Sequence, residues 1–546
     1  MKKTATFLAA AALLTACQSG ADTLAVGEGD YVKGGFPGKA DSSVEAIFVD
    51  FEFSGEVVIS STWSAASAIE DQLLYTIGHL NEDNSVGRLD QLEITNIETT
   101  PTDDGRYLAT YDAKIPVAWG DRDHVPSTYK LLLPADITIA GQDSFTEKYN
   151  HDCVDFGAHD VTRGSMWYYY RPGRSGCDID DNDIVSVDAT VSISDINTTG
   201  KYPEYHKVWE DDVLQVVAVF GKYEDGATSG WDAGIRAYDR FNVAVGQALA
   251  GQDLTTVPAS VPSTPGVATP EVQYFSRMAD GRTVEVTTLL VDNVRTAPNS
   301  FNERYAELSA EADLIVYNGH AGLGANIRAL AAKGDWQTGQ YAMVFMNGCD
   351  TYAYVDSALA DAHAEINADD PDGTKYLDIV TNAMPSFFHS MPNATMALVR
   401  GLMDYEDPKT YEQMFMEIDS AEVVLVSGEQ DNEYFPGFDD DGGDDPGDDA
   451  WDGLEESGTV SRQEEHHYAT PTLAAGRYAF TLSGSSDADL YVRSGVAPTV
   501  ASWECRPYRS GSDERCEVEL SSPAEVHVMV RGWASSSDYA LRGESL

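Results

Sequence analysis

Basic residues are scarce in this chain. Its 546 residues include 35 Lys and Arg against 90 Asp and Glu, which gives a formal net charge of −55. A surface this acidic repels the phosphate backbone, so it excludes nucleic acid as a partner. It also excludes a polybasic patch that would hold the protein to anionic lipids. Because hydrophobic residues make up 42% of the chain, it still has the apolar side chains that a folded protein needs.

Long apolar runs are absent too, apart from residues 5–16. That run follows Met1-Lys2-Lys3 and is too short to span a bilayer. It ends in Leu14-Thr15-Ala16-Cys17, which resembles a bacterial lipobox. The resemblance implies that residues 1–17 are a lipoprotein signal peptide and that Cys17 is lipidated. The protein would then be anchored at the outer membrane or cell surface, periplasmic or extracellular. An ordinary secretory signal with an incidental cysteine is the alternative.

Two further segments have too few apolar residues to form a core. Residues 18–42 are rich in Gly, Ser, Ala and Asp, which is typical of a flexible tether. Residues 431–456 contain the acidic run 439–449, whose charges repel one another and predict an extended linker. Clustered carboxylates suit Ca²⁺, but their spacing matches no EF-hand loop, so a solvated linker is favoured over a calcium site. No other metal or cofactor is indicated.

Cysteine is also rare, with six residues at positions 17, 153, 177, 349, 505 and 516. In an oxidising compartment, cysteines that lie near one another in the sequence favour disulfides. This predicts two bridges, Cys153–Cys177 and Cys505–Cys516. With Cys17 assigned to the lipobox, Cys349 is left as an odd thiol. An odd cysteine in an exported protein is either a nucleophile or a buried, inert side chain.

The body of the chain divides into two segments with different patterns. Residues 43–204 alternate short β-rich runs with turns around one helix-like stretch, which predicts an α+β domain with mainly antiparallel strands. Its aromatic run at 167–170 is interpreted as a strand. In residues 205–430, continuous apolar runs alternate with helix-length segments. Such runs indicate strands covered on both faces, and their order predicts a parallel, doubly wound α/β sheet.

Two strands of the predicted parallel sheet are followed by similar sequences. The run 314–317 is followed by Asn318-Gly319-His320, and the run 341–346 by Asn347-Gly348-Cys349. Parallel strands present their carboxyl ends at the edge where doubly wound folds bind ligands. If the two strands are neighbours, the imidazole and the thiol can approach each other. A helix predicted over 351–366 would place its N-terminus beside Cys349 and lower the pKa of that thiol.

The pairing of strand-His-x-Gly with strand-x-Gly-Cys-Asp resembles the caspase-like cysteine peptidases of clan CD, in their gingipain and clostripain branch. The resemblance covers residues 205–430 and implies that Cys349 is the nucleophile and His320 its catalytic partner. It implies an oxyanion hole made by the backbone N–H groups of Cys349 and of Gly322 or its neighbour. The family usually has Gly directly after the His, whereas this chain has Ala321.

Two residues beside this pair look like supporting residues. These are Asn347 and Asp350, for which helix capping and turn formation are the favoured interpretation. Motifs of other enzyme classes are missing, since the sequence has no H-E-x-x-H, no G-x-S-x-G and no P-loop.

The last segment, residues 457–546, alternates apolar and polar positions and predicts a compact run of strands. It contains Leu473-Ala474-Ala475-Gly476-Arg477-Tyr478 and then Asp487-Ala488-Asp489-Leu490-Tyr491-Val492. These sequences resemble the bacterial pre-peptidase C-terminal domain, which is appended to secreted peptidases, and the resemblance implies an all-β sandwich. The resemblance implies a module without chemistry of its own.

Together these features predict a multidomain, lipid-anchored cysteine endopeptidase that acts on protein or peptide substrates. It would use the His320 and Cys349 dyad, with no cofactor required. The alternative is a surface lipoprotein whose caspase-like domain has lost activity and serves adhesion or substrate binding. Cleavage by the wild-type protein but not by a Cys349 variant would distinguish the two.

Overall fold

The computed structural model describes residues 43–545, apart from positions 123, 159, 195, 355, 437, 439–450, 452, 474–475, 501, 508–510 and 521–523. The expected signal peptide with Cys17, the tether and the acidic run therefore lie outside the described residues. The described chain forms two compact units. The first comprises residues 43–194 and 207–431, and the second comprises 195–206 and 432–545. Within the described residues, no helix is long and apolar enough to cross a membrane.

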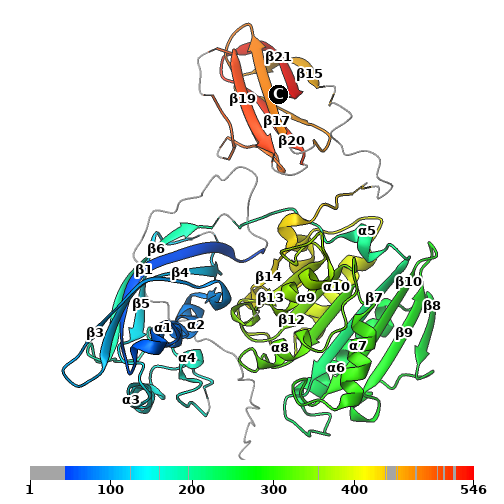
Figure 1. Ribbon diagram of the computed structural model, residues 1–546. Coiled ribbons are helices and arrows are strands. Elements are labelled where there is room, and N and C mark those ends of the chain that lie inside the picture. The colour runs from blue at the N-terminus through cyan, green and yellow to red at the C-terminus, as the bar shows by residue number, and fades with distance from the viewer. Residues whose placement is uncertain are drawn as a thin grey trace, which may run out of the picture. The chain divides into compact units, whose positions relative to one another are not determined.

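The first sheet of the first unit is antiparallel, as the alternating pattern of residues 43–204 indicated (Figure 1). Its strand order is β2-β4-β1-β6-β5, with β3 paired to β4. The inward side chains of these strands form one core with residues of the neighbouring helices. The strands are β1 (Ile47–Ile59), β2 (Val86–Gly87), β3 (Glu93–Pro101), β4 (Tyr107–Trp119), β5 (Thr128–Pro134) and β6 (Ile184–Ile193).

Four helices accompany this sheet, namely α1 (Ala65–Leu73), α2 (Tyr75–Leu80), α3 (Ile139–Tyr149) and α4 (Met166–Tyr169). The strand predicted at 167–170 is wrong, because α4 occupies most of it. A turn precedes the helix, in which the N–H of Met166 donates to the carbonyl of Thr162 at 2.8 Å. This turn starts the helical hydrogen bonding, and burial of Met166 on one side holds it in place. Local turn bonds thus override the β-propensity of the aromatic residues.

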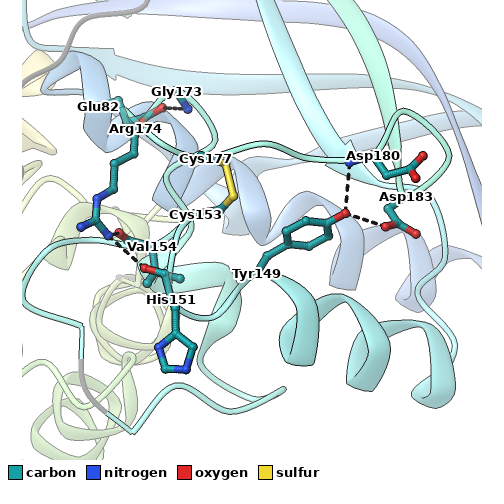
Figure 2. The surroundings of a disulfide bond; sticks show 10 residues. All are labelled: Glu82, Tyr149, His151, Cys153, Val154, Gly173, Arg174, Cys177, Asp180 and Asp183. Carbon is teal, nitrogen blue, oxygen red and sulfur yellow. Dashed lines mark hydrogen bonds between the residues drawn. A yellow bond between two sulfur atoms is a disulfide. The ribbon is translucent and has the colours of Figure 1, made fainter.

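A disulfide joins the segment after α3 to the segment after α4 (Figure 2). Cys153 and Cys177 form this bridge. Nearby, the Tyr149 hydroxyl donates to Asp183 at 2.6 Å and accepts from the backbone N–H of Asp180 at 3.1 Å. The bridge and these bonds hold an irregular segment against the sheet without a regular strand.

The second sheet of the first unit has a parallel centre of five strands, ordered β13-β12-β11-β7-β10. These are β7 (Val213–Gly221), β10 (Thr283–Val291), β11 (Leu314–Asn318), β12 (Ala342–Asn347) and β13 (Leu377–Asn382). Antiparallel strands flank this centre: β14 (Val424–Ser427) on one side, β9 (Glu271–Arg277) and β8 (Asp253–Val257) on the other. Every residue of β11, β12 and β13 is buried, as continuous apolar runs predict.

Helices cover both faces of this sheet. Val217, Ile315 and Met346 face a core that includes residues of α7 (Asn299–Ser309), α8 (Ala325–Ala331) and α9 (Ala358–Ile366). On the opposite face, Phe220 contacts Tyr238 and Phe241 of α6 (Ala233–Ala248). The remaining helices are α5 (Tyr205–Val208), α10 (Met391–Met403) and α11 (Tyr411–Phe415).

The second unit contains the all-β segment that the sequence predicted. Its strands form two antiparallel sheets, ordered β15-β21-β17-β19 and β16-β20-β18, around one shared core. Cys505 and Cys516 form a disulfide here. The strands are β15 (Leu454–Ser461), β16 (Glu465–Ala469), β17 (Gly476–Gly484), β18 (Ala488–Ser494), β19 (Glu514–Leu520), β20 (Val526–Gly532) and β21 (Ser536–Ser545).

Candidate functional site

The ends of β11 and β12 bring the two predicted reactive residues to one place. The strands are parallel neighbours, with Asn318 paired to Asn347 at their carboxyl ends. His320 and Cys349 each follow two residues later, and both line the same pocket of about 670 Å³, part of which is open to solvent. The adjacency of the two strands, on which the dyad prediction depended, is therefore present.

The imidazole of His320 is held by the loop that follows β7. Its Nε2 lies 3.1 Å from the carbonyl oxygen of Tyr223. Since a carbonyl only accepts, Nε2 must carry the hydrogen in this bond, and the neutral ring then has Nδ1 as its basic nitrogen. The ring also packs against both Tyr223 and Phe388, each with its centroid 5.1 Å away. Sequence reasoning missed Tyr223 because the contact uses a backbone oxygen.

Cys349 is half-buried, and its Sγ lies 3.7 Å from the carbonyl oxygen of Ser386. Gly348 lets this segment approach the histidine loop closely. A Cβ on Gly348 would lie 2.8 Å from the carbonyl oxygen of Gly319 and 3.4 Å from the nitrogen of Ala321. The first distance is shorter than real contacts allow, so only glycine fits here.

The expectation that Cys349 is an unpaired thiol is wrong for this structure, which holds Cys349 in a disulfide. Any nucleophilic chemistry of Cys349 therefore requires its reduction first.

The helix predicted over 351–366 is interrupted in the structure. A three-residue 3-10 turn, Thr351–Ala353, follows Cys349, and the helix α9 begins only at Ala358. Asp350, which lies between Cys349 and this turn, is in the left-handed conformation, with φ of +52°. A single 3-10 turn has little macrodipole, so the predicted lowering of the Cys349 pKa by a helix N-terminus loses its basis.

A buried polar network lies beneath the pocket. Asn347 donates to Asn318 at 2.9 Å and accepts from the Ser386 hydroxyl at 2.6 Å. The Ser390 hydroxyl donates to Glu422, which is fully buried, and burial raises the pKa of Glu422 to about 7. The network fixes the loop that carries Ser386. The interpretation of Asn347 as a capping or turn residue is thus wrong, because its amide bonds side chains across the sheet.

Asp350 connects the site to the first sheet of the same unit. It is fully buried, and its Oδ1 accepts a hydrogen bond from the Asn81 side chain at 3.0 Å. Asn81 in turn accepts from Arg171 at 3.1 Å. Burial raises the pKa of Asp350 to about 6, which the charge of Arg171 opposes. Asp350 makes no side-chain cap, so the capping interpretation is wrong for it, whereas its role in a turn is confirmed, because its carbonyl accepts from the backbone N–H of Ala353 at 3.0 Å.

The oxyanion prediction concerns the turn after His320. Gly322 has φ of +60°, a conformation that favours glycine, and it does not line the pocket. The side chain of Asn326 closes this turn by donating to the carbonyl of His320 at 2.8 Å. Within the described chain, the backbone N–H groups of Ala321 and Gly322 have no hydrogen-bond partner. Of the two, Ala321 lies closer to the Gly348 segment.

No cluster of three or more metal-ligating side chains occurs in the described part of the chain. The acidic run considered for Ca²⁺ falls on residues 439–449, of which the structure describes none.

Comparison with known proteins identifies the C-terminal segment. Residues 472–532 match the family described as "Bacterial pre-peptidase C-terminal domain". This segment is a pre-peptidase C-terminal domain. The match falls on the second unit and does not reach His320 or Cys349, so it says nothing of their chemistry.

Several curated relatives share this region. A zinc metalloprotease of Helicobacter pylori is 42% identical over 83 residues, which are 15% of this chain and 32% of that protein. A hemagglutinin/proteinase of Vibrio cholerae is 42% identical over 83 residues, 15% of this chain and 14% of that protein. A virulence metalloprotease of Vibrio anguillarum is 38% identical over 85 residues, 16% of this chain and 14% of that protein. The chain thus spans a third or less of these relatives.

Among solved structures, one described as "Solution structure of vEP C-ter 100" is 35% identical to this chain. The match covers 16% of this chain and 85% of that one, with a TM-score of 0.14.

Proposed function

We propose that this protein is an exported cysteine endopeptidase of the caspase-like kind, active once Cys349 is reduced. The observation that carries the proposal is the meeting of His320 and Cys349 in one pocket, at the ends of adjacent parallel strands. A parallel sheet with two reactive side chains at its carboxyl edge is the arrangement in which doubly wound folds place their active sites.

The reduced Cys349 acts as the nucleophile. The thiol first gives its proton to Nδ1 of His320, the basic nitrogen of the neutral ring. The resulting thiolate forms a bond to the scissile carbonyl carbon, and the negative charge moves to the carbonyl oxygen. The N–H groups of Cys349 and of Ala321 or Gly322 stabilise that oxyanion. As the C–N bond breaks, His320 donates a proton from Nδ1 to the departing amine. Water then attacks the thioester with His320 as general base, which releases the acid and restores the thiol.

Tyr223 and Phe388 support the histidine in this scheme. The bond from Nε2 to the Tyr223 carbonyl fixes the tautomer and points the proton-transferring Nδ1 away from that loop. The two aromatic rings restrict rotation of the imidazole. An imidazole held in one orientation is already close to the reactive geometry, and such orientation raises the reaction rate.

The pre-peptidase C-terminal domain supports a peptidase by association. The relatives that share it are named as proteases, although they match this chain in that region alone. Their printed names are of metallo- and serine types, and one is called an extracellular protease. We infer that this chain is likewise exported and acts on proteins, with a different catalytic group.

Hydrolysis of fluorogenic peptides, measured with and without dithiothreitol, tests the proposal. Activity should appear only after reduction, because Cys349 is in a disulfide. It should vanish in Cys349→Ala and fall nearly as far in His320→Ala, since the two groups act as a unit. Cys505→Ala/Cys516→Ala, which removes a bridge of the second unit, is the control that should keep activity.

The disulfide at Cys349 favours a second candidate, an inactive binding protein in which this cysteine is structural. Under that function, reduced wild type and Cys349→Ala would show equal background hydrolysis. Equal rates across Arg, Lys, Asn and Asp substrates would exclude the peptidase.

A further inference from the structure

One helix forms a wall of the pocket that holds His320 and Cys349. The residues of α6 that line it are Ala233, Arg236, Ala237 and Arg240. Their spacing of i, i+3, i+4 and i+7 places all four on one face of the helix. The alanines leave the pocket open beside the helix. The arginines are exposed and follow each other at one helical turn, about 6 Å along the axis.

These two arginines lack the carboxylate partners that several other arginines of this unit have. Arg282, Arg304 and Arg400 each form an ion pair with a carboxylate at 3.0 Å or less. For Arg236 and Arg240 the described residues provide no side-chain hydrogen bond, ion pair or ring contact. In a chain with 90 Asp and Glu residues, two adjacent unpaired guanidinium groups on a pocket wall are unexpected.

The nearest carboxylates in the sequence are engaged elsewhere. Asp232, one turn before Arg236, accepts the backbone N–H groups of Tyr223, Glu224 and Ile235. Asp239, next to Arg240, accepts the backbone N–H of Gly266 at 2.8 Å. Both acids therefore hold loops in place, which leaves the guanidinium groups available to a ligand.

The rest of the pocket wall likewise carries no negative charge. It contains no Asp or Glu among its lining residues, although it includes His320 and His389. Apolar side chains such as Phe388 and Met391 complete it. A partly apolar pocket strengthens charge-assisted hydrogen bonds, because it excludes some of the water that would screen them. The wall thus suits an anion attached to an organic chain, and it repels a cationic side chain.

We propose that Arg236 and Arg240 bind a carboxylate of the substrate peptide close to the bond that Cys349 attacks. This inference deepens the proposed function, on which the assignment to a peptide substrate rests. The guanidinium fork matches a carboxylate in a bidentate manner. The carboxylate belongs either to an Asp or Glu side chain, which gives an acid-specific endopeptidase, or to the C-terminus, which gives a carboxypeptidase-like cut.

Binding is measured by fluorescence anisotropy on the full chain with Cys349→Ala, so that no probe is cleaved. The probes are three short labelled alanine peptides. The first has an internal Glu and an amidated C-terminus, and the second has Gln in place of Glu and the same amidated C-terminus. The third is the Gln peptide with a free C-terminal carboxylate. Tighter binding of the Glu peptide identifies the side-chain carboxylate, and tighter binding of the free-ended peptide identifies the C-terminal one. The preference should be about tenfold, the contribution of one charge-assisted hydrogen bond.

Adding Arg236→Gln and Arg240→Gln should abolish this preference while the Gln peptide with an amidated end binds as before. The matched control carries Arg277→Gln and Arg400→Gln, which remove two exposed arginines of the same unit that do not line the pocket. The control should keep the preference, although its net charge changes equally. Loss of the preference in the control, or its survival in the pocket variant, would overturn the proposal.

The binding assay separates this inference from the peptidase itself. Carboxylate preference without hydrolysis by the reduced wild type would retain the anion site and reject the peptidase. Hydrolysis that shows no preference between Glu and Gln peptides or between free and amidated ends would retain the peptidase and reject the anion site.

Discussion

At the scale of single residues, the candidate site consists of reactive side chains at the ends of parallel strands and a buried polar network beneath them. His320 and Cys349 could be predicted because each follows a continuous apolar run, and parallel strands present their ends at one edge. The Tyr223 carbonyl and Glu422 could not be predicted. The first acts through its backbone, and the second is brought to the network from a distant part of the chain. Neither leaves a local pattern in the sequence.

Glu422 provides a test of the buried network through pH. In the unfolded chain its carboxyl ionises near the ordinary pKa of 4.5, whereas burial raises the folded pKa to about 7. The folded state therefore binds more protons in this window, and the stability contributed by Glu422 is lost as the pH rises through it. Glu422→Gln removes the titrating carboxyl, so the variant does not lose this stability as the pH rises. The variant should gain up to about 3 kcal/mol relative to wild type between about pH 5 and pH 8.

Urea unfolding at the two pH values measures this change. Glutamine is a fair substitute, because its side-chain oxygen can still accept from the Ser390 hydroxyl, as Glu422 does. Glu303→Gln, which removes an exposed carboxylate of α7 in the same unit, is the control for the loss of one negative charge. A relative stability that does not vary with pH would contradict the assigned ionisation.

The close approach at Gly348 gives a second residue-scale prediction. In Gly348→Ala the added methyl group would lie 2.8 Å from the Gly319 carbonyl oxygen, so the two loops must separate. We expect peptide hydrolysis by the reduced protein to fall by at least about 100-fold, the loss that a misplacement of about 1 Å causes. Gly246→Ala in α6 is a matched control for folding in the same unit, since its backbone is helical and a Cβ there meets only Tyr274 at 3.9 Å. Equal activity of Gly348→Ala and wild type would mean that the loop spacing is irrelevant.

At the scale of elements, continuous and alternating patterns predicted the two sheets of the first unit and the β-sheets of the second. The errors have local causes. The edge strands β8 and β9, on either side of a proline-rich segment at 258–270, were not predicted, because neither contains a continuous apolar run like those of the central strands. The helix predicted after Cys349 is interrupted because Asp350 is drawn into a buried contact with Asn81, a residue of the first sheet's domain. A tertiary contact therefore determines where this helix begins, and the sequence around Cys349 does not reveal that contact.

The contact of Asn81 with Asp350 tests whether the first sheet's domain supports the site. Asn81→Ala removes the donor to buried Asp350 and the acceptor for Arg171. Leaving buried polar groups without partners should cost about 1–3 kcal/mol in the free energy of unfolding. It should also lower peptide hydrolysis, because Asp350 directly follows Cys349. Asn182→Ala, an exposed asparagine bonded to Asp180, is the control. Stability loss without any change in kcat or KM would show that the domain does not affect the site.

At the scale of the whole molecule, the acidic run at 439–449 lies in the sequence between the α/β sheet of the first unit and the all-β segment. The boundary predicted at residue 430 or 431 is close to the end of the first unit at Asp431. No sequence pattern indicated that residues 195–206, which lie far earlier in the chain, belong with the second unit. Glu204 explains this grouping, since its buried carboxylate accepts the backbone N–H groups of Glu433 at 2.6 Å and Tyr434 at 2.9 Å.

This grouping predicts where the chain can be cut. A chain that ends at residue 438 keeps both donors to Glu204 and the packing of His206 on Tyr434, with ring centroids 6.0 Å apart. A chain that ends at residue 431 leaves the carboxylate of Glu204 buried with neither donor, a cost of about 1–3 kcal/mol or more for a charged group. We therefore expect the longer truncation product to melt at the higher temperature in differential scanning fluorimetry. Adding Glu204→Gln should narrow the difference, because the neutral amide loses less when its donors are removed. If both products melt at the same temperature, residues 432–438 contribute nothing to the segment around Glu204, and the two parts of the chain separate at the end of the first unit instead.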